Sequence, residues 1–424
     1  MRLIYSIFIQ LYGFFLRIAA LFNDKASQWV DGRNGLFSRL ELALREVDRN
    51  KQPVIWFHVS SLGEFEQGRP VMEEFKKIWP AKKILLTFFS PSGYQVRKDY
   101  DQADFVFYLP LDTLKNARRF LNIVQPEMVF FVKYDFWFNF LKEIHCKHIR
   151  LYFISALFRE NQHFFKWYGG WFRRQLHFVT HFFVQNRESE ELLKSVGITH
   201  VTLTGDTRFD RVYAIAAKKT TFPLIEKFCA GNMVFIAGSS WEPDESVFIP
   251  LTLHKELNLK YIIAPHDTSP GRIQFIIEKL DQKVLRYSEL NDGNASLADI
   301  LIIDSVGILS QLYRYATVAF IGGGYAGGIH NIQEPVTFGI PVFFGPNYQK
   351  FREARDLVAI GGAFSITTSG ELFAEVKEIT ENPEEHKRLS AICKKYVEEN
   401  RGATEKIVRY VEGVGKWAGG RVGE

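Results

Sequence analysis

The sequence predicts an α/β protein of two doubly wound domains that follow an apolar N-terminal segment. Its length of 424 residues suits two or three domains. Apolar runs of strand length alternate with polar helical segments from residue 52 to 206, and the same alternation returns from 233 to 346. Continuous apolar strands separated by helices are typical of parallel sheets that are covered on both faces.

The first thirty residues, 1–30, form a segment that we expect to associate with a membrane. Residues 3–16 are nearly all apolar, and after Arg17 the apolar residues resume. The stretch reaches the roughly 20 residues of a spanning helix only if Gln10 and Arg17 are accepted within it. A helix that lies flat in the interface is equally compatible, and a buried first helix is the alternative. No small-residue cleavage site follows, which argues against a secretory signal peptide.

The first α/β domain is expected over residues 31–215. Its predicted strands cover, in order, 53–61, 82–90, 104–110, 128–134, 150–157 and 200–206, with a polar helical segment between neighbours. The alternation is lost over 211–231. There the small, basic run 216–223 ends in proline and indicates an interdomain linker.

The second α/β domain is expected over residues 216–424. Its predicted strands cover 233–240, 261–267, 300–306, 318–324 and 341–346, and a helical stretch follows from about 381 to 411. Ligands of such sheets bind at the carboxyl ends of the strands. We therefore expect the binding crevices of the two domains to face each other.

Composition and charge exclude several classes of protein. Apolar residues make up 46% and charged residues 24%, so the chain is globular. Three cysteines without CxxC spacing exclude a disulfide scaffold and a cysteine zinc site, and no P-loop, HExxH or GxSxG motif occurs. Residues 1–217 carry 30 basic and 22 acidic residues, a net charge of +8, while the remainder carries −3. This asymmetry suggests an anionic partner for the first half, or only a solvated surface, and +5 overall without a basic stripe argues against nucleic acid.

The segment 58–70, HVSSLGEFEQGRP, supplies a candidate general base. A strand ends within 58–61, Gly63 forms a turn, and Glu64 starts a helix. In this position Glu64 can deprotonate a sugar hydroxyl at the carboxyl end of the strand, where the helix N-terminus also favours anions. The alternative is a first-turn glutamate that only stabilises its own helix.

The segment 320–339 indicates a nucleotide site. Five glycines within residues 322–328 follow a strand, and a helix is predicted to start near Asn331. Backbone without side chains can approach a ligand, the helix N-terminus can hold a phosphate, and Glu334 can bind a ribose. A flexible loop is the alternative, and the loose, late match to GxGxxG does not favour a dinucleotide fold.

Other strand ends add candidate binding and catalytic residues, which we expect at the carboxyl edges of the same two sheets. In the second half these are the segments 237–245, 264–267 and 304–309. In the first half they are Asp135 within KYDFWFN and Arg208 within TGDTRFD. Taken singly, Asp135 is equally consistent with a helix N-cap and Arg208 with a surface ion pair.

In this order the motifs resemble those of the 3-deoxy-D-manno-octulosonic acid (Kdo) transferases of lipopolysaccharide assembly, over most of the chain after the N-terminal segment. The family's H-x-x-S-x-G-E, with its catalytic glutamate, reads HVSSLGE with Glu64, and T-G-x-x-K-F-D reads TGDTRFD with Arg208 in the lysine position. A-G-S-x-x-x-x-E reads AGSSWEPDE, and G-G-H-N-x-x-E-P followed by G-x-P-V-x-x-G-P reads GGIHNIQEP and GIPVFFGP.

Several positions depart from the family pattern and indicate a divergent branch. E-T-E-L-W-P-N reads KYDFWFN, so Asp135 replaces a glutamate and Lys133 replaces the first one. The arginine of the donor loop P-R is His266, and the glutamate of D-x-x-G-E-L is Ile308.

The resemblance implies a GT-B glycosyltransferase, with two Rossmann-like domains facing a cleft, on the cytoplasmic side of the inner membrane. It would transfer Kdo from CMP-Kdo to the 6′-hydroxyl of a lipid A precursor (lipid IVA) with inversion. Glu64 would be the general base, with Asp135 and Arg208 as further catalytic residues. The donor-binding residues would be Pro265, His266, Val306, Gly307, Ile308, Asn331, Ile332, Gln333 and Glu334.

The same resemblance implies no cofactor or metal beyond the donor substrate CMP-Kdo. Two alternatives remain open at this point. One is a GT-B transferase or epimerase that uses a UDP-sugar, and the other is a non-catalytic membrane-associated binding protein.

Overall fold

The protein divides into two compact units in the computed structural model, which describes residues 1–419. One unit comprises Met1–Asp210 together with the residues from Gly402 onward, and the other comprises Arg211–Arg401. The boundary therefore lies at 210/211 instead of 215/216. The expectation that the second domain extends to residue 424 is also corrected, because the chain returns to the first unit at Gly402; residues 420–424 lie outside the described part.

The first unit contains a parallel sheet of seven strands. These are β1 (Val54–Val59), β2 (Lys83–Phe88), β3 (Phe105–Tyr108), β4 (Pro126–Val132), β5 (Arg150–Ala156), β6 (His181–Val184) and β7 (Val201–Leu203). Their order is β3-β2-β1-β4-β5-β6-β7, and each neighbouring pair runs parallel. The predicted parallel sheet is confirmed, and β6 lies outside the predicted strands.

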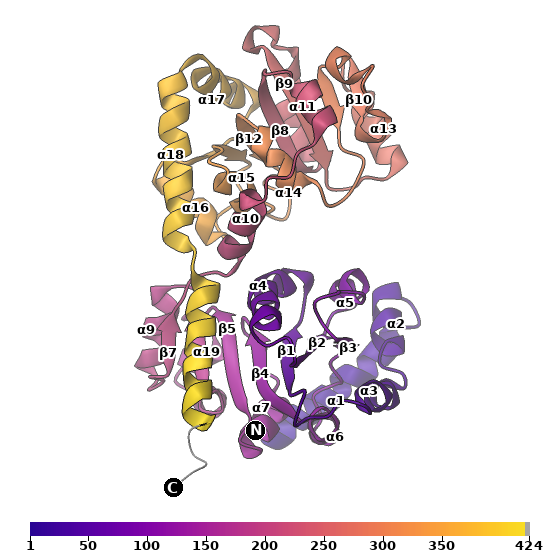
Figure 1. Ribbon diagram of the computed structural model, residues 1–424, viewed down its shortest axis with the longest axis vertical. Coiled ribbons are helices and arrows are strands. Elements are labelled where there is room, and N and C mark those ends of the chain that lie inside the picture. The colour runs from indigo at the N-terminus through magenta and orange to yellow at the C-terminus, as the bar shows by residue number, and fades with distance from the viewer. Residues whose placement is uncertain (420–424) are drawn as a thin grey trace. The chain divides into compact units, whose positions relative to one another are not determined.

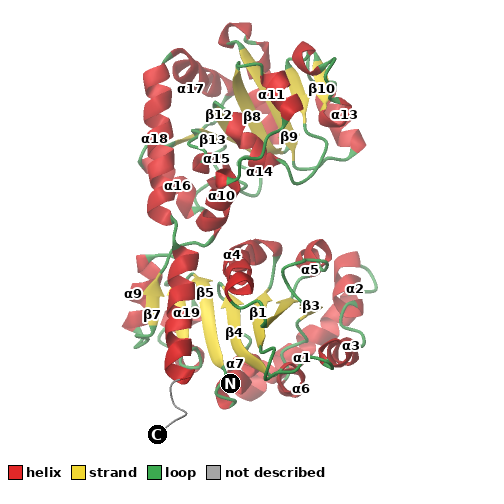
Figure 2. Cartoon of the chain, in the orientation of Figure 1, coloured by secondary structure: helices red, strands yellow, loops and turns green. Residues whose placement is uncertain are grey.

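Helices cover both faces of this sheet (Figure 2). They are α2 (Asp24–Asp31), α3 (Leu36–Leu44), α4 (Leu62–Ile78), α5 (Pro91–Arg97), α6 (Leu114–Val124), α7 (Phe138–Cys146), α8 (Gly170–Leu176), α9 (Arg187–Ser195) and α19 (Ala403–Gly419), besides α1. Side chains of β1 alternate between two buried clusters: Val54 and Trp56 enter one, and Ile55, Phe57 and Val59 enter the other. A strand buried on both faces has the continuous apolar sequence from which it was predicted.

Helix α1 (Arg2–Ala19) packs on the first unit along one side only. Ile9 and Gly13 are buried, and a methyl group added at Gly13 would lie 2.6 Å from Leu111, so the helix approaches closely there. Most of its other apolar side chains are exposed, among them Phe8 at 64%. By length and composition α1 is able to cross a membrane, and only 11% of it is buried.

The second unit contains another parallel sheet of seven strands. These are β8 (Met233–Ser240), β9 (Leu259–Pro265), β10 (Val284–Arg286), β11 (Ile300–Ile302), β12 (Val318–Ile321), β13 (Val342–Phe344) and β14 (Ala363–Ser365). Their order is β10-β11-β9-β8-β12-β13-β14, and each neighbouring pair is parallel. The five predicted strands are present, and the short edge strands β10 and β14 complete the sheet.

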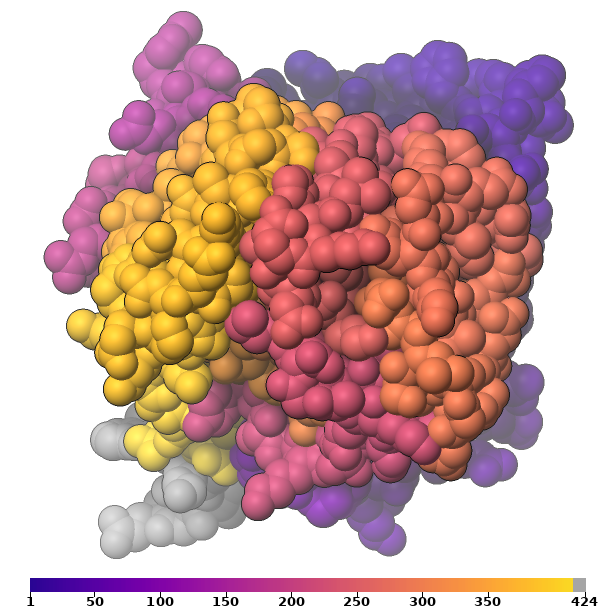
Figure 3. All heavy atoms as spheres, turned by 90° about the horizontal axis from the view of Figure 1, so that it is seen from above, coloured from indigo at the N-terminus to yellow at the C-terminus, as the bar shows by residue number. Residues whose placement is uncertain are grey.

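Helices also cover both faces of the second sheet (Figure 2). They are α11 (Pro223–Cys229), α12 (Glu242–Phe248), α13 (Pro270–Ile277), α14 (Leu309–Leu312), α15 (Gln333–Thr337), α16 (Arg352–Ala359), α17 (Ser369–Glu381) and α18 (Pro383–Asn400). On the surface of this unit, residues near 380 (yellow) and residues near 280 (salmon) lie on opposite sides (Figure 3).

The chain leaves the first unit after Asp210 and returns to it at Gly402, and hydrogen bonds connect these two points within the first unit. The chain leaves the first unit within helix α10 (Arg208–Ala217), and α19 begins directly after the chain has returned (Figure 1). The carboxylate of Asp210 accepts hydrogen bonds from the backbone N–H groups of Gly402 (2.5 Å) and Thr404 (2.7 Å). Ile407, Val408 and Val411 then enter the core cluster that contains β1 and α4. Burial of this apolar face is the physical reason why α19 belongs to the first unit.

Candidate active site

The first cluster of candidate residues lies at the carboxyl edge of the first sheet. Strands β2 and β3 extend from one side of β1, whereas β4 pairs with its other side, so the strand order reverses between β1 and β4. Ligands of doubly wound sheets bind at such a reversal. Glu64 follows β1 and Asp135 follows β4, so both predicted residues belong to this point.

Glu64 lies in the first turn of α4 and is buried. Ser61 is the N-cap of α4, and its hydroxyl accepts the N–H of Glu64. The Glu64 carboxylate reaches back to the N–H of Ser60, with Oε2 at 2.5 Å. Glu64 is only 6% exposed. Glu64 can therefore both stabilise the start of its own helix and serve as a candidate base, since its hydrogen bond to Ser60 holds the buried carboxyl group at the strand end.

Ser60 connects Glu64 to Asp135. Its N–H binds Glu64, and its hydroxyl donates to Oδ2 of Asp135 in a short hydrogen bond. Burial, and then the negative charge of Asp135, raise the pKa of Glu64 to about 7, against the opposing effects of the Ser60 N–H and Lys133. A carboxyl group with this pKa is half-ionised near neutrality, which suits a general base.

Three further residues support this pair and lie outside the predicted site. His58 is fully buried, and its Nε2 accepts the indole N–H of Trp137 at 3.2 Å. The same Nε2 lies 3.4 Å from Oδ2 of Asp135. Its Nδ1 lies 2.9 Å from the hydroxyl of Thr87 on β2. His58 begins the HVSSLGE motif and Trp137 belongs to KYDFWFN. Both residues could therefore have been predicted from the motifs that supplied Glu64 and Asp135.

Arg208, the first residue of α10, is held by Asp206 on the preceding loop. Its Nε and Nη2 lie 2.9 and 2.6 Å from Oδ2 of Asp206, which also accepts the side-chain amide of Gln67 on α4. Burial opposes ionisation of Asp206, but the charge and hydrogen bonds of Arg208 outweigh it and keep the pKa of Asp206 below its ordinary value. The structure therefore links Arg208 to the helix that carries Glu64, with its charge compensated by Asp206.

A second cluster lies at the carboxyl edge of the second sheet, where the order reverses between β8 and β12. Trp241 follows β8, His266 follows β9, and His330 follows β12. The indole N–H of Trp241 donates to Nε2 of His330 at 3.1 Å. The His266 ring stacks on both, with centroids 4.5 Å from Trp241 and 4.7 Å from His330. Burial, and then the neighbouring His266, lower the pKa of His330, so this ring is neutral near pH 7.

The glycine-rich loop after β12 is shaped by packing within the protein. A methyl group at Gly322 would lie 2.2 Å from the carbonyl oxygen of Ser239, and one at Gly324 would lie 2.4 Å from the nitrogen of Gly345. Gly323 has φ +92° and donates its N–H to Asp244. The expectation that these three glycines allow a ligand to approach is therefore corrected, because protein backbone occupies that space. Gly327 has nothing within 4 Å and faces open space.

The predicted residues 331–334 form a tight turn with an unsatisfied buried amide. Asn331 accepts the N–H of Gln333 at 3.0 Å and donates to Glu334 at 3.2 Å. Gln333 is 1% exposed, and neither atom of its side-chain amide has a partner within the described residues. Ile332 is buried and fixes the turn. The helix that follows, α15, has only five residues and starts at 333, so its dipole gives less phosphate binding than a helix starting at 331 would.

The remaining predicted donor residues lie at neighbouring strand ends. Pro265 ends β9 in the core, and the N–H of His266 bonds to the carbonyl of Ser240 on β8. Val306 is 88% exposed. Gly307 has φ +97°, and a methyl group added to it would have no atom within 4 Å. Val306 and Gly307 therefore have open space around them, whereas Ile308 is half-buried. Within residues 1–419 no cluster of three metal-ligating side chains occurs.

These features define a class of protein by its fold. Two parallel doubly wound units in one chain constitute the GT-B fold, and solved structures share it. A glycosyltransferase from Rickettsia africae matches with a TM-score of 0.56 at 11% identity, covering 85% of this chain and 97% of its own. UDP-GlcNAc 2-epimerase from Neisseria meningitidis, solved with UDP-GlcNAc, matches with a TM-score of 0.59 at 17% identity, covering 84% and 99%.

Sequence comparison relates the chain to one family within this class. Residues 34–211 match the family model of 3-deoxy-D-manno-octulosonic-acid transferase. The 3-deoxy-D-manno-octulosonic acid transferase of Haemophilus influenzae is 24% identical over 84% of this chain and 85% of its own length. A bifunctional glycosyltransferase/methyltransferase of Fusobacterium nucleatum is 24% identical over 85% of this chain, which spans 57% of that protein. The family-model match and the similarity to these transferases over most of the chain support the Kdo transferase family and indicate a glycosyltransferase.

Proposed function

We propose that the protein transfers Kdo from CMP-Kdo to the 6′-hydroxyl of a lipid A precursor such as lipid IVA, with inversion at the anomeric carbon. Glu64 accepts the proton of the acceptor hydroxyl while the oxygen attacks C2 of Kdo from the face opposite CMP. CMP departs as a phosphate monoester, and no metal or cofactor takes part.

The observation that carries this proposal is the environment of Glu64. Its carboxyl group is buried, its pKa is raised to about 7, and Ser60 fixes it beside Asp135 at the strand-order reversal. A base with a pKa near the working pH combines a large ionised fraction with sufficient basicity. Asp135 adjusts this basicity through its charge. Arg208 contributes positive charge toward the leaving CMP, and its pairing with Asp206 makes us expect a smaller effect from Arg208→Gln than from Glu64→Gln.

The second unit supplies the donor site in this proposal. The orphaned amide of Gln333 and the carboxylate of Glu334 are polar groups suited to the ribose, with Asn331 and Ile332 fixing their turn. Pro265 and His266 lie toward the base. Val306, Gly307 and Ile308 form the loop that covers the nucleotide.

The exposed apolar side of α1 supports association with a membrane, which we propose is the inner membrane with the catalytic units on its cytoplasmic side. Leu3, Ile7, Phe8, Leu11 and Phe15 are all exposed on this helix. An amphipathic helix of this kind enters the interface and holds its protein at the surface from which a lipid acceptor is reached.

The test uses full-length protein in detergent, with CMP-Kdo generated in situ and lipid IVA as acceptor. Mass spectrometry of the lipid is expected to show a gain of one Kdo unit or more. Glu64→Gln should abolish transfer while the affinity for CMP stays within a few-fold. Glu74→Gln, on the exposed part of the same helix and paired with Lys77, is the matched control and should remain active.

Each outcome distinguishes this proposal from its alternatives. Activity of Glu64→Gln at the wild-type rate would remove Glu64 as the base. Protection against thermal unfolding by UDP but not by CMP would favour a UDP-sugar enzyme. Absence of transfer to any lipid acceptor, with CMP still bound, would favour a non-catalytic binding protein.

A further inference from the structure

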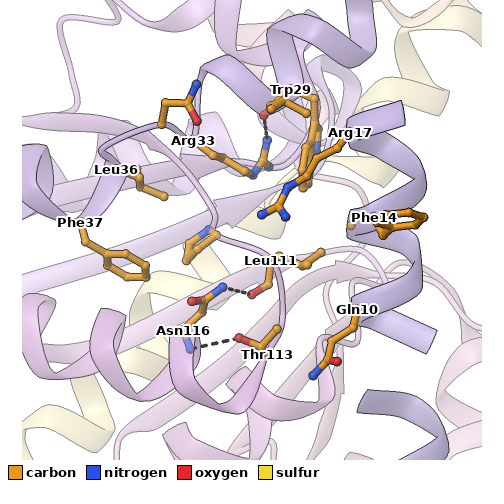
Figure 4. Close-up of a pocket in the computed structure, with 14 residues that line it drawn as sticks. Gln10, Phe14, Arg17, Trp29, Arg33, Leu36, Phe37, Leu111, Thr113 and Asn116 are labelled. Carbon is orange, nitrogen blue, oxygen red and sulfur yellow. Dashed lines mark hydrogen bonds between the residues drawn. The ribbon is translucent and has the colours of Figure 1, made fainter. Parts of the chain in front are cut away.

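A cavity of about 420 Å³ lies beside α1 in the first unit. Its lining comes from α1, from the segment that contains α2 and α3, and from residues 110–116, which run from the loop after β3 into the first turn of α6 (Figure 4). No residue of 58–64 or 133–137 lines it, so the cavity is distinct from the candidate catalytic edge. Its volume falls within the range of sites for small organic ligands.

The walls of this cavity are largely apolar, and its charged groups are all basic. Phe14, Leu36, Phe37 and Leu111 supply hydrocarbon surface. Arg17 and Arg33 are the charged residues of the lining, which contains no aspartate or glutamate. Figure 4 shows both guanidinium groups directed into the same space. Two positive charges in one cavity without a carboxylate favour an anionic occupant.

Arg33 is a largely buried guanidinium that is held by carbonyl groups. It donates to the backbone oxygens of Trp29, Phe89 and Leu109 at 2.8–2.9 Å and lies 3.7 Å above the Trp29 ring. Within residues 1–419 it forms no ion pair. Burial is the main cause that lowers its pKa to about 9, and an anion bound nearby would oppose that effect. The protein thus fixes this charge without neutralising it.

Arg17 projects into the cavity from the last turn of α1. It has no hydrogen bond, ion pair or ring contact within the described part of the chain. It is also solvent-exposed, as is its neighbour Phe14, so the cavity opens at the surface of α1. Phe8, Leu11, Phe15 and Leu21 continue the exposed apolar surface from that opening. The occupant therefore combines an anionic group with hydrocarbon that is continuous with a lipid phase.

We propose that this cavity binds one acidic phospholipid of the bilayer. Its phosphate pairs with the guanidinium groups of Arg17 and Arg33, and the upper part of one acyl chain lies against Phe14 and Phe37. Guanidinium groups bind phosphate oxygens through paired hydrogen bonds, and the apolar walls bury methylene groups. The bound lipid fixes the first unit on the membrane in one orientation. This site does not depend on the identity of the transferred sugar.

The test measures lipid binding to the delipidated full-length protein in a non-ionic detergent. The probes are dioctanoyl phosphatidylglycerol, dioctanoyl phosphatidylcholine and inorganic phosphate, with native mass spectrometry and thermal shift as readouts. We expect phosphatidylglycerol to bind with one-to-one stoichiometry. Arg17→Gln should weaken it about tenfold or more, which corresponds to about 1.4 kcal/mol. Asn34→Trp, which fills the cavity from its exposed rim, should block it while Arg17 is kept.

Arg2→Gln is the matched control, because Arg2 is exposed on the same helix and does not line the cavity. Equal loss in Arg2→Gln and Arg17→Gln would overturn the proposal in favour of general surface attraction. Equal binding of phosphatidylcholine would overturn the anionic specificity, and equal protection by inorganic phosphate would overturn the lipid. Displacement of phosphatidylglycerol by lipid IVA at lower concentration would assign the cavity to the acceptor instead. Because every readout is binding, the outcome is independent of whether Kdo transfer is observed.

Discussion

The indole N–H of Trp137 donates a hydrogen bond to Nε2 of the buried His58 over 3.2 Å. Nε2 has one lone pair, so the bond requires that this nitrogen carry no proton. The proton of a neutral His58 then lies on Nδ1, from which it reaches the Thr87 hydroxyl. Asp135 is left to accept the Ser60 hydroxyl beside Glu64.

The tautomer of His58 gives a first prediction. Nitrogen-15 NMR of histidine-labelled protein should show His58 protonated at Nδ1 in the wild type. Trp137→Phe should release this preference and lower the free energy of unfolding by about 1–3 kcal/mol, since a buried nitrogen loses its partner. Trp167→Phe, at a residue that is 91% exposed, should change neither quantity. A wild-type His58 protonated at Nε2 would contradict the assignment.

The pH dependence of transfer gives a second prediction. A base must be ionised to act, so the rate should rise with pH through the Glu64 pKa of about 7. Burial is the largest cause of that raised pKa and the charge of Asp135 is the next, so Asp135→Asn should shift the acidic limb to lower pH. The pH–kcat/KM profile of the two proteins is the measurement. The acidic limb could instead stay in place in Asp135→Asn, or move equally in the exposed control Asp101→Asn. Either result would show that the charge of Asp135 does not raise the pKa of the base.

The glycine-rich loop of the second unit gives a third prediction. Gly322→Ala places a methyl group 2.2 Å from the Ser239 carbonyl oxygen, and backbone on both sides must move. We expect a loss of about 1–3 kcal/mol in the free energy of unfolding, measured by urea denaturation. Gly327→Ala, five residues away with nothing within 4 Å, should leave stability within about 0.5 kcal/mol. Similar behaviour of the two variants would show that packing does not fix this loop.

The attachment of α1 gives a fourth prediction. Asp112 is completely buried and accepts the Tyr5 hydroxyl at 2.5 Å and the N–H groups of Asn139 and Phe140 at 3.0 Å. Burial raises its pKa to about 6, so the folded state prefers its protonated form. The stabilisation by this group is complete below pH about 4 and is lost as pH rises through 6, by about 3 kcal/mol.

Urea titrations between pH 4.5 and 7.5 test this sign. Wild-type stability should fall relative to that of Asp112→Asn as the pH increases, because asparagine does not ionise. Tyr5→Phe should lower stability at all these pH values by about 1.5–3 kcal/mol through loss of a hydrogen bond to a carboxyl group. A difference between wild type and Asp112→Asn that stays constant with pH would contradict the raised pKa.

Local pattern predicted the strands other than β6, β10 and β14, because a long strand buried on both faces has a continuous apolar sequence, whereas these three have only three or four residues each. It therefore placed Glu64 and Asp135 at one sheet edge and the candidate donor residues at the other. It did not predict contacts between distant segments. Trp137 and His58 are 79 residues apart, and the space around Gly322 is closed by Ser239, so neither relation leaves a local signal. Helices α2 and α3 were missed because their amphipathic pattern is short and follows a strongly apolar segment.

The return of the chain to the first unit sets an order of events during synthesis. The apolar face of α19 that completes the core around β1 emerges from the ribosome about 190 residues after Asp210, its N-terminal anchor. The second unit, complete at Arg401, can fold first as a continuous piece, whereas the first unit stays open until its last helix is made. A nascent chain stopped near residue 400 would leave exposed the apolar side chains of β1 and α4 against which Ile407, Val408 and Val411 pack in the finished protein.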